Sequence, residues 1–159
     1  FLIEAQTLVA PTQYGTPRRT VVGWDQARLA MVVAVLQARC GLNISDSDIY
    51  LNISGGVRIC EPAADLAVAA ALISAACGKP LGRDASWIGV VGLGGEIRPV
   101  SLLESRLKEA AKMGYRTAYA PPDRGQPASG RSENLHGCTV LRVGELSEVV
   151  SRISLPEAA

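Results

Sequence analysis

The sequence is poor in the residues that mark several classes of binding site. Aromatic residues make up 4% of its 159 residues, which argues against binding of single-stranded nucleic acid by base stacking. Histidine occurs once, at His136, and the four cysteines, Cys40, Cys60, Cys77 and Cys138, form no Cys-x-x-Cys pair. We therefore predict no metal site within the chain.

An excess of one charge is also absent. The 16 lysines and arginines balance 15 aspartates and glutamates, so no field of the whole molecule draws it to nucleic acid or anionic lipid. Any DNA binding needs a local patch. No apolar run is long enough to span a membrane and no signal peptide is recognisable, so with its unpaired cysteines the chain is expected in the cytoplasm, without a membrane partner.

Nucleotide-binding motifs are missing as well. Neither G-x-x-x-x-G-K-[ST] nor G-x-G-x-x-G occurs, so no nucleotide cofactor is predicted for this chain.

The chain's 48% hydrophobic residues suffice for the core of one domain, which we place at 1–155 with a tail at 156–159. Because Phe1 is not a methionine, we expect a fragment of a longer protein.

Hydrophobic periodicity predicts an α/β domain, with a mixed sheet packed against helices. The segment 11–20 has the glycine and proline of a loop or hairpin connection, and 121–133 has the composition of a mobile loop. Expected strands cover 2–10, 20–23, 49–53, 87–91, 96–98, 116–120 and 139–143, and expected helices 25–40, 63–76, 102–114 and 144–153.

The helix 63–76 is the predicted centre of the domain. Apart from Asp65 and Ser74 it is apolar on every side, so it needs cover on more than one face. Pro62 suits the first helical position and Glu61 is the expected cap.

Asp65 is the one charge of this buried helix. We predict a structural role, in which the helix dipole and a nearby arginine such as Arg58 neutralise the carboxylate. A contact with another subunit is the alternative.

The junction before this helix resembles the proteolytic domain of the Lon proteases. There, a Gly-Gly pair and a proline precede the catalytic serine, whose position Ala63 occupies. The stretch 95–121, GEIRPVSLLESRLKEAAKMGYRTAYAP, resembles the Lon segment that carries the catalytic lysine, and Glu104 stands at the position of that lysine. The resemblance implies a Lon-like fold without the Ser-Lys dyad, and hence a catalytically inactive variant.

The wider pattern, with TPRR, GWDQARLAMVVAVLQARCGL and the unusual EPAAD, resembles the C-terminal domain of the RadA (Sms) family of bacterial DNA recombination and repair proteins. The resemblance implies a non-proteolytic scaffold that supports a homo-hexameric ring. It also implies a RecA-like ATPase and a zinc finger elsewhere in the protein. ATP, Mg and Zn would belong there, as would branch migration of DNA together with a RecA-type recombinase.

Other functions stay open at this stage. A displaced nucleophile would make the chain a serine endopeptidase, using Ser54, Ser101 or Ser105 with Lys108, although surface or turn serines are the default interpretation. A second candidate pair of nucleophile and base is Cys60 with His136. The default interpretation is that Cys60 is a buried thiol and His136 a surface histidine, neither with a catalytic role. A protein-interaction module with no DNA role is the third alternative.

Basic residues could form a DNA-binding strip if a ring aligned them along one face or channel. Arg18 and Arg19 are the leading pair, because a loop rich in glycine and proline can present both outward. Glu104 and Lys108, four residues apart on a helix, are expected to form a surface ion pair. The candidates for DNA contact are Arg18, Arg19, Arg58, Arg106, Lys108 and Lys112, with Arg98 and Arg116 as further members of the strip.

Overall fold

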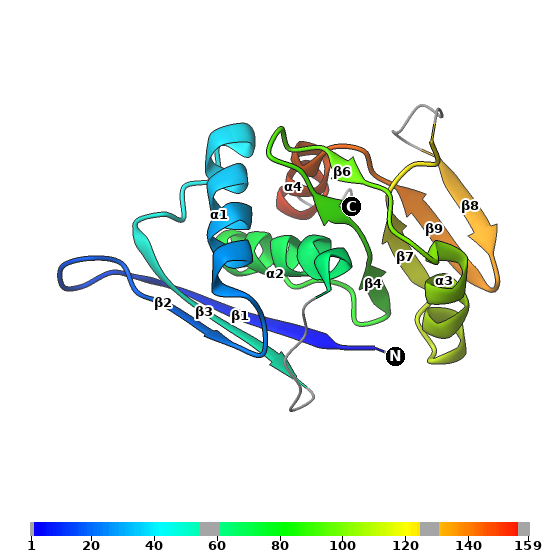
Figure 1. Cartoon of the computed structure of the whole chain (residues 1–159), viewed down its shortest axis with the longest axis horizontal. Helices are drawn as coiled ribbons and strands as arrows, with labels where there is room; N and C mark the ends of the chain where they lie inside the picture. Colours follow the sequence, from blue (N-terminus) through cyan, green and yellow to red (C-terminus); the bar gives the residue numbers. More distant parts are fainter. Residues whose placement is uncertain (1, 55–60, 125–130, 156–159) are drawn as a thin grey trace.

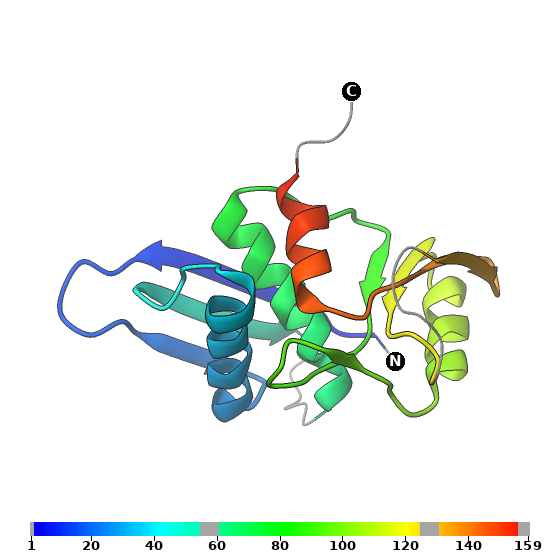
Figure 2. The same cartoon turned by 90° about the horizontal axis from the view of Figure 1, so that it is seen from above.

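The computed structural model describes residues 2–54, 61–124 and 131–155, which fold as a mixed α/β domain with four α-helices and nine strands. Two sheets, of three and four strands, lie on opposite sides of the central helix, and a two-stranded hairpin completes the set (Figure 1). The view from above shows the same order, with the central helix between the two sheets (Figure 2). The predicted mixture of helices and strands is confirmed.

The first sheet has the strand order β1-β3-β2, with β1 at Glu4–Pro11, β2 at Arg19–Val22 and β3 at Ser47–Ser54. A hairpin between the first two strands is therefore wrong, because β3 lies between them. β3 is antiparallel to β1 and parallel to β2. The helix that connects β2 to β3 explains the arrangement, since parallel neighbours need such a crossover.

That connecting helix, α1 (Gln26–Cys40), has the ends that the sequence predicted. The Asp25 carboxylate accepts a hydrogen bond from the backbone N–H of Ala27, and Gly41 closes the helix in the left-handed conformation. Its entry is fixed by Gly23, whose φ is +84°, where an added Cβ would lie 3.0 Å from the Ile53 carbonyl oxygen. Only glycine fits this close approach without strain.

The central helix, α2 (Asp65–Cys77), follows a 3₁₀ turn at Pro62–Ala64. Its larger apolar side chains are fully buried against α1, β1 and α4 (Leu146–Ser154), which confirms the predicted cover on several sides. The Thr7 hydroxyl of β1 also donates to the Ala71 carbonyl, at 2.8 Å. The buried members are Leu66, Val68, Ala69, Ala70, Leu72 and Ile73.

The second sheet has the order β4-β7-β9-β8. β4 (Ala85–Trp87), β7 (Thr117–Ala120) and β9 (Cys138–Arg142) are parallel, and β8 (Ser132–Leu135) is antiparallel to β9. The Trp87 ring stacks on that of Tyr119, with centroids 3.8 Å apart and planes 4° from parallel. On the other face lies α3 (Leu103–Lys112), whose Leu107 and Ala110 are buried.

Two expectations for this half of the chain need correction. The strand expected at 87–91 divides into β4 and β5 (Val90–Val91), because Gly89 exchanges backbone hydrogen bonds with the start of the central helix instead. β5 pairs antiparallel with β6 (Ile97–Arg98) through a turn rich in glycine. β8 was missed, since its first residues fall within the loop expected at 121–133. Residues 125–130 of that loop and the tail 156–159 lie outside the described residues.

Among the described helices, none combines the length and apolarity needed to cross a membrane.

The connection between β1 and β2 is held by Asp48 of β3. Its carboxylate oxygen Oδ1 accepts the backbone N–H of Arg18 at 2.8 Å and the hydroxyl of Thr12 at 3.0 Å. The hydrogen bond from the Arg18 backbone lowers the pKa of Asp48, and the Thr12 hydroxyl and the charges of Arg18 and Arg19 act in the same direction against desolvation. The ionised carboxylate therefore organises this connection.

We expect the amide proton signal of Arg18 to follow the ionisation of Asp48 in an NMR pH titration, with a midpoint below about 3.9, the ordinary aspartate pKa. The pKa of Asp48 is lower in the folded chain than in the unfolded chain. The hydrogen bond therefore stabilises the fold at pH values above the unfolded-state pKa, and this stabilisation is lost as the pH falls through the folded-state pKa. In Asp48→Asn this titration should vanish. A midpoint at or above 3.9 would contradict the assignment.

Candidate functional site

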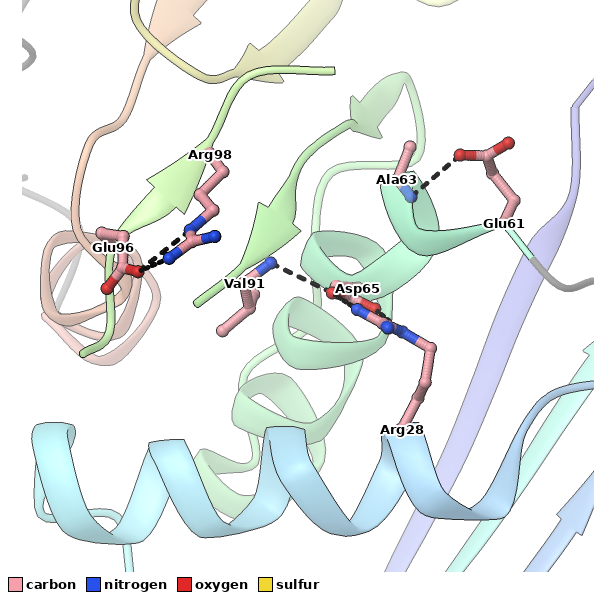
Figure 3. A network of polar contacts seen from close by, with 7 residues as sticks. All are labelled: Arg28, Glu61, Ala63, Asp65, Val91, Glu96 and Arg98. Carbon is pink, nitrogen blue, oxygen red and sulfur yellow. Dashed lines mark hydrogen bonds and ion pairs between the residues drawn. The ribbon is translucent and has the colours of Figure 1, made fainter. Parts of the chain in front are cut away.

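The turn at which the central helix begins has backbone groups that are held in hydrogen bonds. The N–H of Ala63 donates to the Glu61 carboxylate at 3.1 Å, which confirms the predicted cap (Figure 3). The Ala63 carbonyl accepts the N–H of Gly89 at 3.0 Å, and its side chain is buried with the residue 5% exposed. A backbone amide at a helix opening can hold an oxyanion only if it is free to donate, and this one is already bonded to a carboxylate.

A cavity of about 610 Å³ lies beside this turn. One wall is the alanine-rich face of the central helix, and another is β4 with the residues just before it. From α3, Arg106 reaches the cavity, where its guanidinium bonds the Ser101 carbonyl at 2.9 Å and lies 3.5 Å from Glu61 Oε1. The volume is within the usual range of ligand-binding pockets.

Glu104 belongs to a different surface. Its side chain is 73% exposed, and its Oε1 lies 3.1 Å from His136 Nε2 and 4.0 Å from Lys108 Nζ. The ion pair with Lys108 confirms the prediction, and the contact with His136 was not foreseen. Among the described residues that line the cavity, α3 contributes Arg106, Glu109 and Ala110 but not Glu104. Ala63 and Glu104, which stand at the positions of the Lon serine and lysine, therefore do not both line this cavity.

The displaced nucleophiles find no support in the described residues. Ser101 and Ser105 are exposed, and the ion-pair partner of Lys108 is Glu104 rather than a serine. Ser54 ends β3 and has no described contact with Lys108. Cys60 lies outside the described residues.

Asp65 forms the main buried polar contact of the domain. It is 0% exposed, and its two carboxylate oxygens accept hydrogen bonds from the guanidinium of Arg28, the first at 2.8 Å from Nε. Oδ2 also accepts the backbone N–H of Val91 at 3.0 Å. Figure 3 shows these three residues coming from α1, α2 and β5. One carboxylate thus joins two helices to the hairpin.

The structural role predicted for Asp65 is supported, but its partner is Arg28, and Arg58 lies outside the described residues. The hydrogen bond to Asp65 raises the pKa of Arg28. A signal for this pairing exists in the sequence, because residues 28, 32 and 36 follow one another at helical spacing. Arg28 therefore belongs to the same stripe as the buried Val32 and Leu36.

The predicted basic pair does not behave as a pair. Arg18 is exposed, but the guanidinium of Arg19 is turned onto the chain, where it bonds the carbonyls of Ser45, at 2.9 Å, and Ser47. The expectation that both point outward is wrong for Arg19. The Ser45 and Ser47 carbonyls, before and at the start of β3, accept these bonds and hold the guanidinium against the chain.

Three further basic candidates lie on α3. Lys108 and Lys112 are exposed, whereas Arg106 is engaged at the cavity. The connection between β1 and β2 and the helix α3 occupy opposite ends of the molecule (Figure 1). Arg98 pairs with Glu96 at 3.0 Å. Within one copy of the chain, the described candidates therefore form two separate groups rather than one strip.

Arg142 is a buried charge that the sequence reasoning missed. It is 6% exposed, donates to the Pro121 carbonyl at 2.8 Å, and lies 3.7 Å from Asp123 and 3.6 Å from Glu133. It ties β9 to both described ends of the predicted loop. Within the described ranges, no group of three or more histidine, cysteine, aspartate or glutamate side chains is placed to hold a metal ion.

Fold and site together define a mixed α/β domain in which the turn before the central helix carries a buried alanine, Ala63, beside a cavity. No family model matches the chain. It is 47% identical over 153 residues to the DNA repair protein RadA of Brucella abortus, 52% identical over 148 residues to that of Rickettsia bellii, and 42% identical over 149 residues to that of Streptococcus pyogenes. The chain is therefore homologous to a segment of the proteins named DNA repair protein RadA.

These matches cover 93 to 96% of this chain but only 31 to 33% of the relatives. The chain thus spans about a third of the length of the curated relatives it matches.

Replacing Asp65 with alanine should lower the free energy of unfolding by about 3 kcal/mol, because Arg28 and the Val91 amide lose their buried partner. We take the lower end of the range for buried pairs because the Arg28 side chain is 25% exposed. Urea denaturation of the 159-residue chain measures this loss. The matched control is Asp46→Ala, an exposed aspartate, which should change stability by less than about 0.5 kcal/mol. Similar losses in both variants would contradict the structural role.

Proposed function

We propose that this chain is a Lon-like domain without peptidase activity, which serves as an assembly platform in a DNA repair protein of the RadA family. The observation that carries the proposal is the separation of Ala63 from Glu104. One is an enclosed methyl group at the helix opening, and the other is a carboxylate paired with His136 on the surface.

Nucleophilic catalysis needs an attacking atom and a base within hydrogen-bond reach of each other. Alanine supplies no attacking atom, and the Glu61 cap occupies the amide of the same residue. The Lon-like motifs, the buried helix behind them and the strand that leads to it support the proposed fold. A Lon-like domain without peptidase activity would serve to hold subunits together.

The remaining functions belong to the whole protein. The chain matches 32% of the Brucella RadA protein, and we assign ATP, Mg and zinc binding to parts of such proteins outside this segment. There, a RecA-like motor would drive branch migration of DNA in the cytoplasm, together with a recombinase of the RecA type.

A homo-hexameric ring would combine the two separate basic groups. Head-to-tail contacts bring one end of a subunit beside the opposite end of the next. In such a ring, Arg18 of one copy would lie close to Lys108 and Lys112 of its neighbour. Each contact with phosphate is weak, but repetition around the ring multiplies it.

The triple variant Arg18→Ala, Lys108→Ala, Lys112→Ala should bind duplex DNA more weakly than the unaltered chain. The slope of log K against log salt should become less negative by about 0.9 for each phosphate that is no longer neutralised. Fluorescence anisotropy with a labelled duplex over a series of salt concentrations measures this slope. Arg19 and Arg106 are left in place because their bonds to backbone carbonyls support the fold.

The control removes two other exposed cations, in Arg124→Ala, Arg152→Ala, and should retain the original slope. An equal change in both variants would mean that general charge and not the two basic groups determines DNA retention. Sedimentation velocity of the same samples tests assembly, and a strictly monomeric chain even when joined to its motor would contradict the platform.

The absence of peptidase activity is tested with a serine-reactive fluorophosphonate and unfolded casein. We expect no labelled residue and no cleavage, because Ala63 offers no nucleophile. Labelling that disappears when a single serine is replaced would identify the chain as an endopeptidase instead.

A further inference from the structure

The cavity beside Ala63 is bounded by the open edge of the second sheet. β4 is an outer strand of that sheet, since it pairs with β7 on one side only. The residues 85–88 line the cavity. An outer strand exposes N–H and C=O groups that can pair with another strand.

The register shows which groups of β4 are exposed at this edge. The N–H of Ile88 donates to the Tyr119 carbonyl, and the Asp84 carbonyl accepts the N–H of Thr117. In a strand, the backbone groups of successive residues point alternately to opposite sides. The even-numbered residues therefore bond to β7, and Ala85 and Trp87 direct their backbone groups away from it.

These groups point toward the central helix. Gly89, the next odd-numbered residue, donates to the Ala63 carbonyl and accepts the N–H of Leu66. The Ala85 N–H bonds the Gly82 carbonyl. No described residue bonds the N–H or C=O of Trp87, or the C=O of Ala85. Three backbone groups of β4 are thus available along the cavity.

Small side chains keep this edge accessible. Ala64, at the end of the 3₁₀ turn, and Ala67 and Ala71 of α2 follow one another at helical spacing along the cavity, and the last two are partly exposed. The opposite wall holds residues 2–5, at the start of β1, which is itself an outer strand. A new strand lies about 4.8 Å from the strand it joins. A side chain larger than alanine at position 67 would occupy that space.

The cavity wall carries charges of both signs. Glu4, Glu61 and Glu109 line the cavity, as do Arg83 and Arg106. Glu61 is 3.5 Å from Arg106, whereas Glu4 accepts only an amide N–H, from Gln6, among the described residues. A lysine or arginine of an incoming segment would complement Glu4.

We propose that this cavity binds an extended peptide segment of a partner protein, which adds as a strand to β4. The segment carries small apolar residues against the alanines and a basic residue toward Glu4. Its backbone bonds to Trp87 and Ala85 supply affinity, and the alanines set the side-chain size. Ala63 leaves the bound segment uncleaved. The inference does not depend on the proposed DNA contacts.

The test uses the ¹⁵N-labelled 159-residue chain and a blocked peptide of alternating alanine and valine with a lysine at each end. We expect the peptide to move the Trp87 amide proton signal downfield in a saturable manner, as a hydrogen bond forms. The matched probe is the same peptide with its central amides N-methylated. It should bind about tenfold more weakly for each backbone hydrogen bond that it cannot form.

Ala67→Leu should weaken peptide binding at least to the same extent, because leucine fills the space beside β4. Its matched control is Ala76→Leu, on an exposed position of the same helix away from the cavity, which should bind as the unaltered chain does. Alanine and leucine have similar helix propensities, so both variants should fold. Unchanged dispersion of the remaining amide signals verifies this.

Several results would overturn the proposal. Equal affinity for the methylated and unmethylated peptides would exclude strand pairing, as would equal binding by the two leucine variants. A Trp87 amide already protected from hydrogen exchange in the free chain would mean that the chain itself occupies the edge. A signal that moves with protein concentration alone would assign the edge to a second copy. DNA retention in the salt series is measured separately, so the two proposals fail independently.

Discussion

The carboxylate of Asp65 is the contact on which the arrangement of the domain depends. A fully buried charge is stable only where its partners are arranged around it, and here one guanidinium and one backbone amide supply them. The carboxylate lies in the first turn of α2, where the helix dipole favours negative charge. Because its partners come from α1 and β5, it fixes the helix opening relative to both, and with it the wall of the cavity.

The sequence predicted the elements whose signals are local. The ends of α1 follow from Asp25 and Gly41, and the cap of the central helix from Glu61 and Pro62. Their hydrogen bonds join residues close together in the chain, so the residue types determine them directly. The same holds for the buried face of α3, which periodicity reveals.

What the sequence did not predict depends on contacts between distant segments. The position of β3 between β1 and β2 results from the crossover through α1, whereas the turn residues at 11–20 equally suit a hairpin. The pairing of Asp65 with Arg28 rests on how two helices cross. The inward turn of Arg19 likewise reflects carbonyl groups 26 and 28 residues away, and residue type does not encode such distances.

The two tryptophans of the chain are divided between its two sheets. Trp24 is buried in the core beside the first sheet, and Trp87 is stacked on Tyr119 in the second. Each part of the molecule therefore carries its own fluorophore, in a different environment. Chains that keep a single indole would report separately on the unfolding of each part, and so reveal whether the domain melts as one cooperative unit.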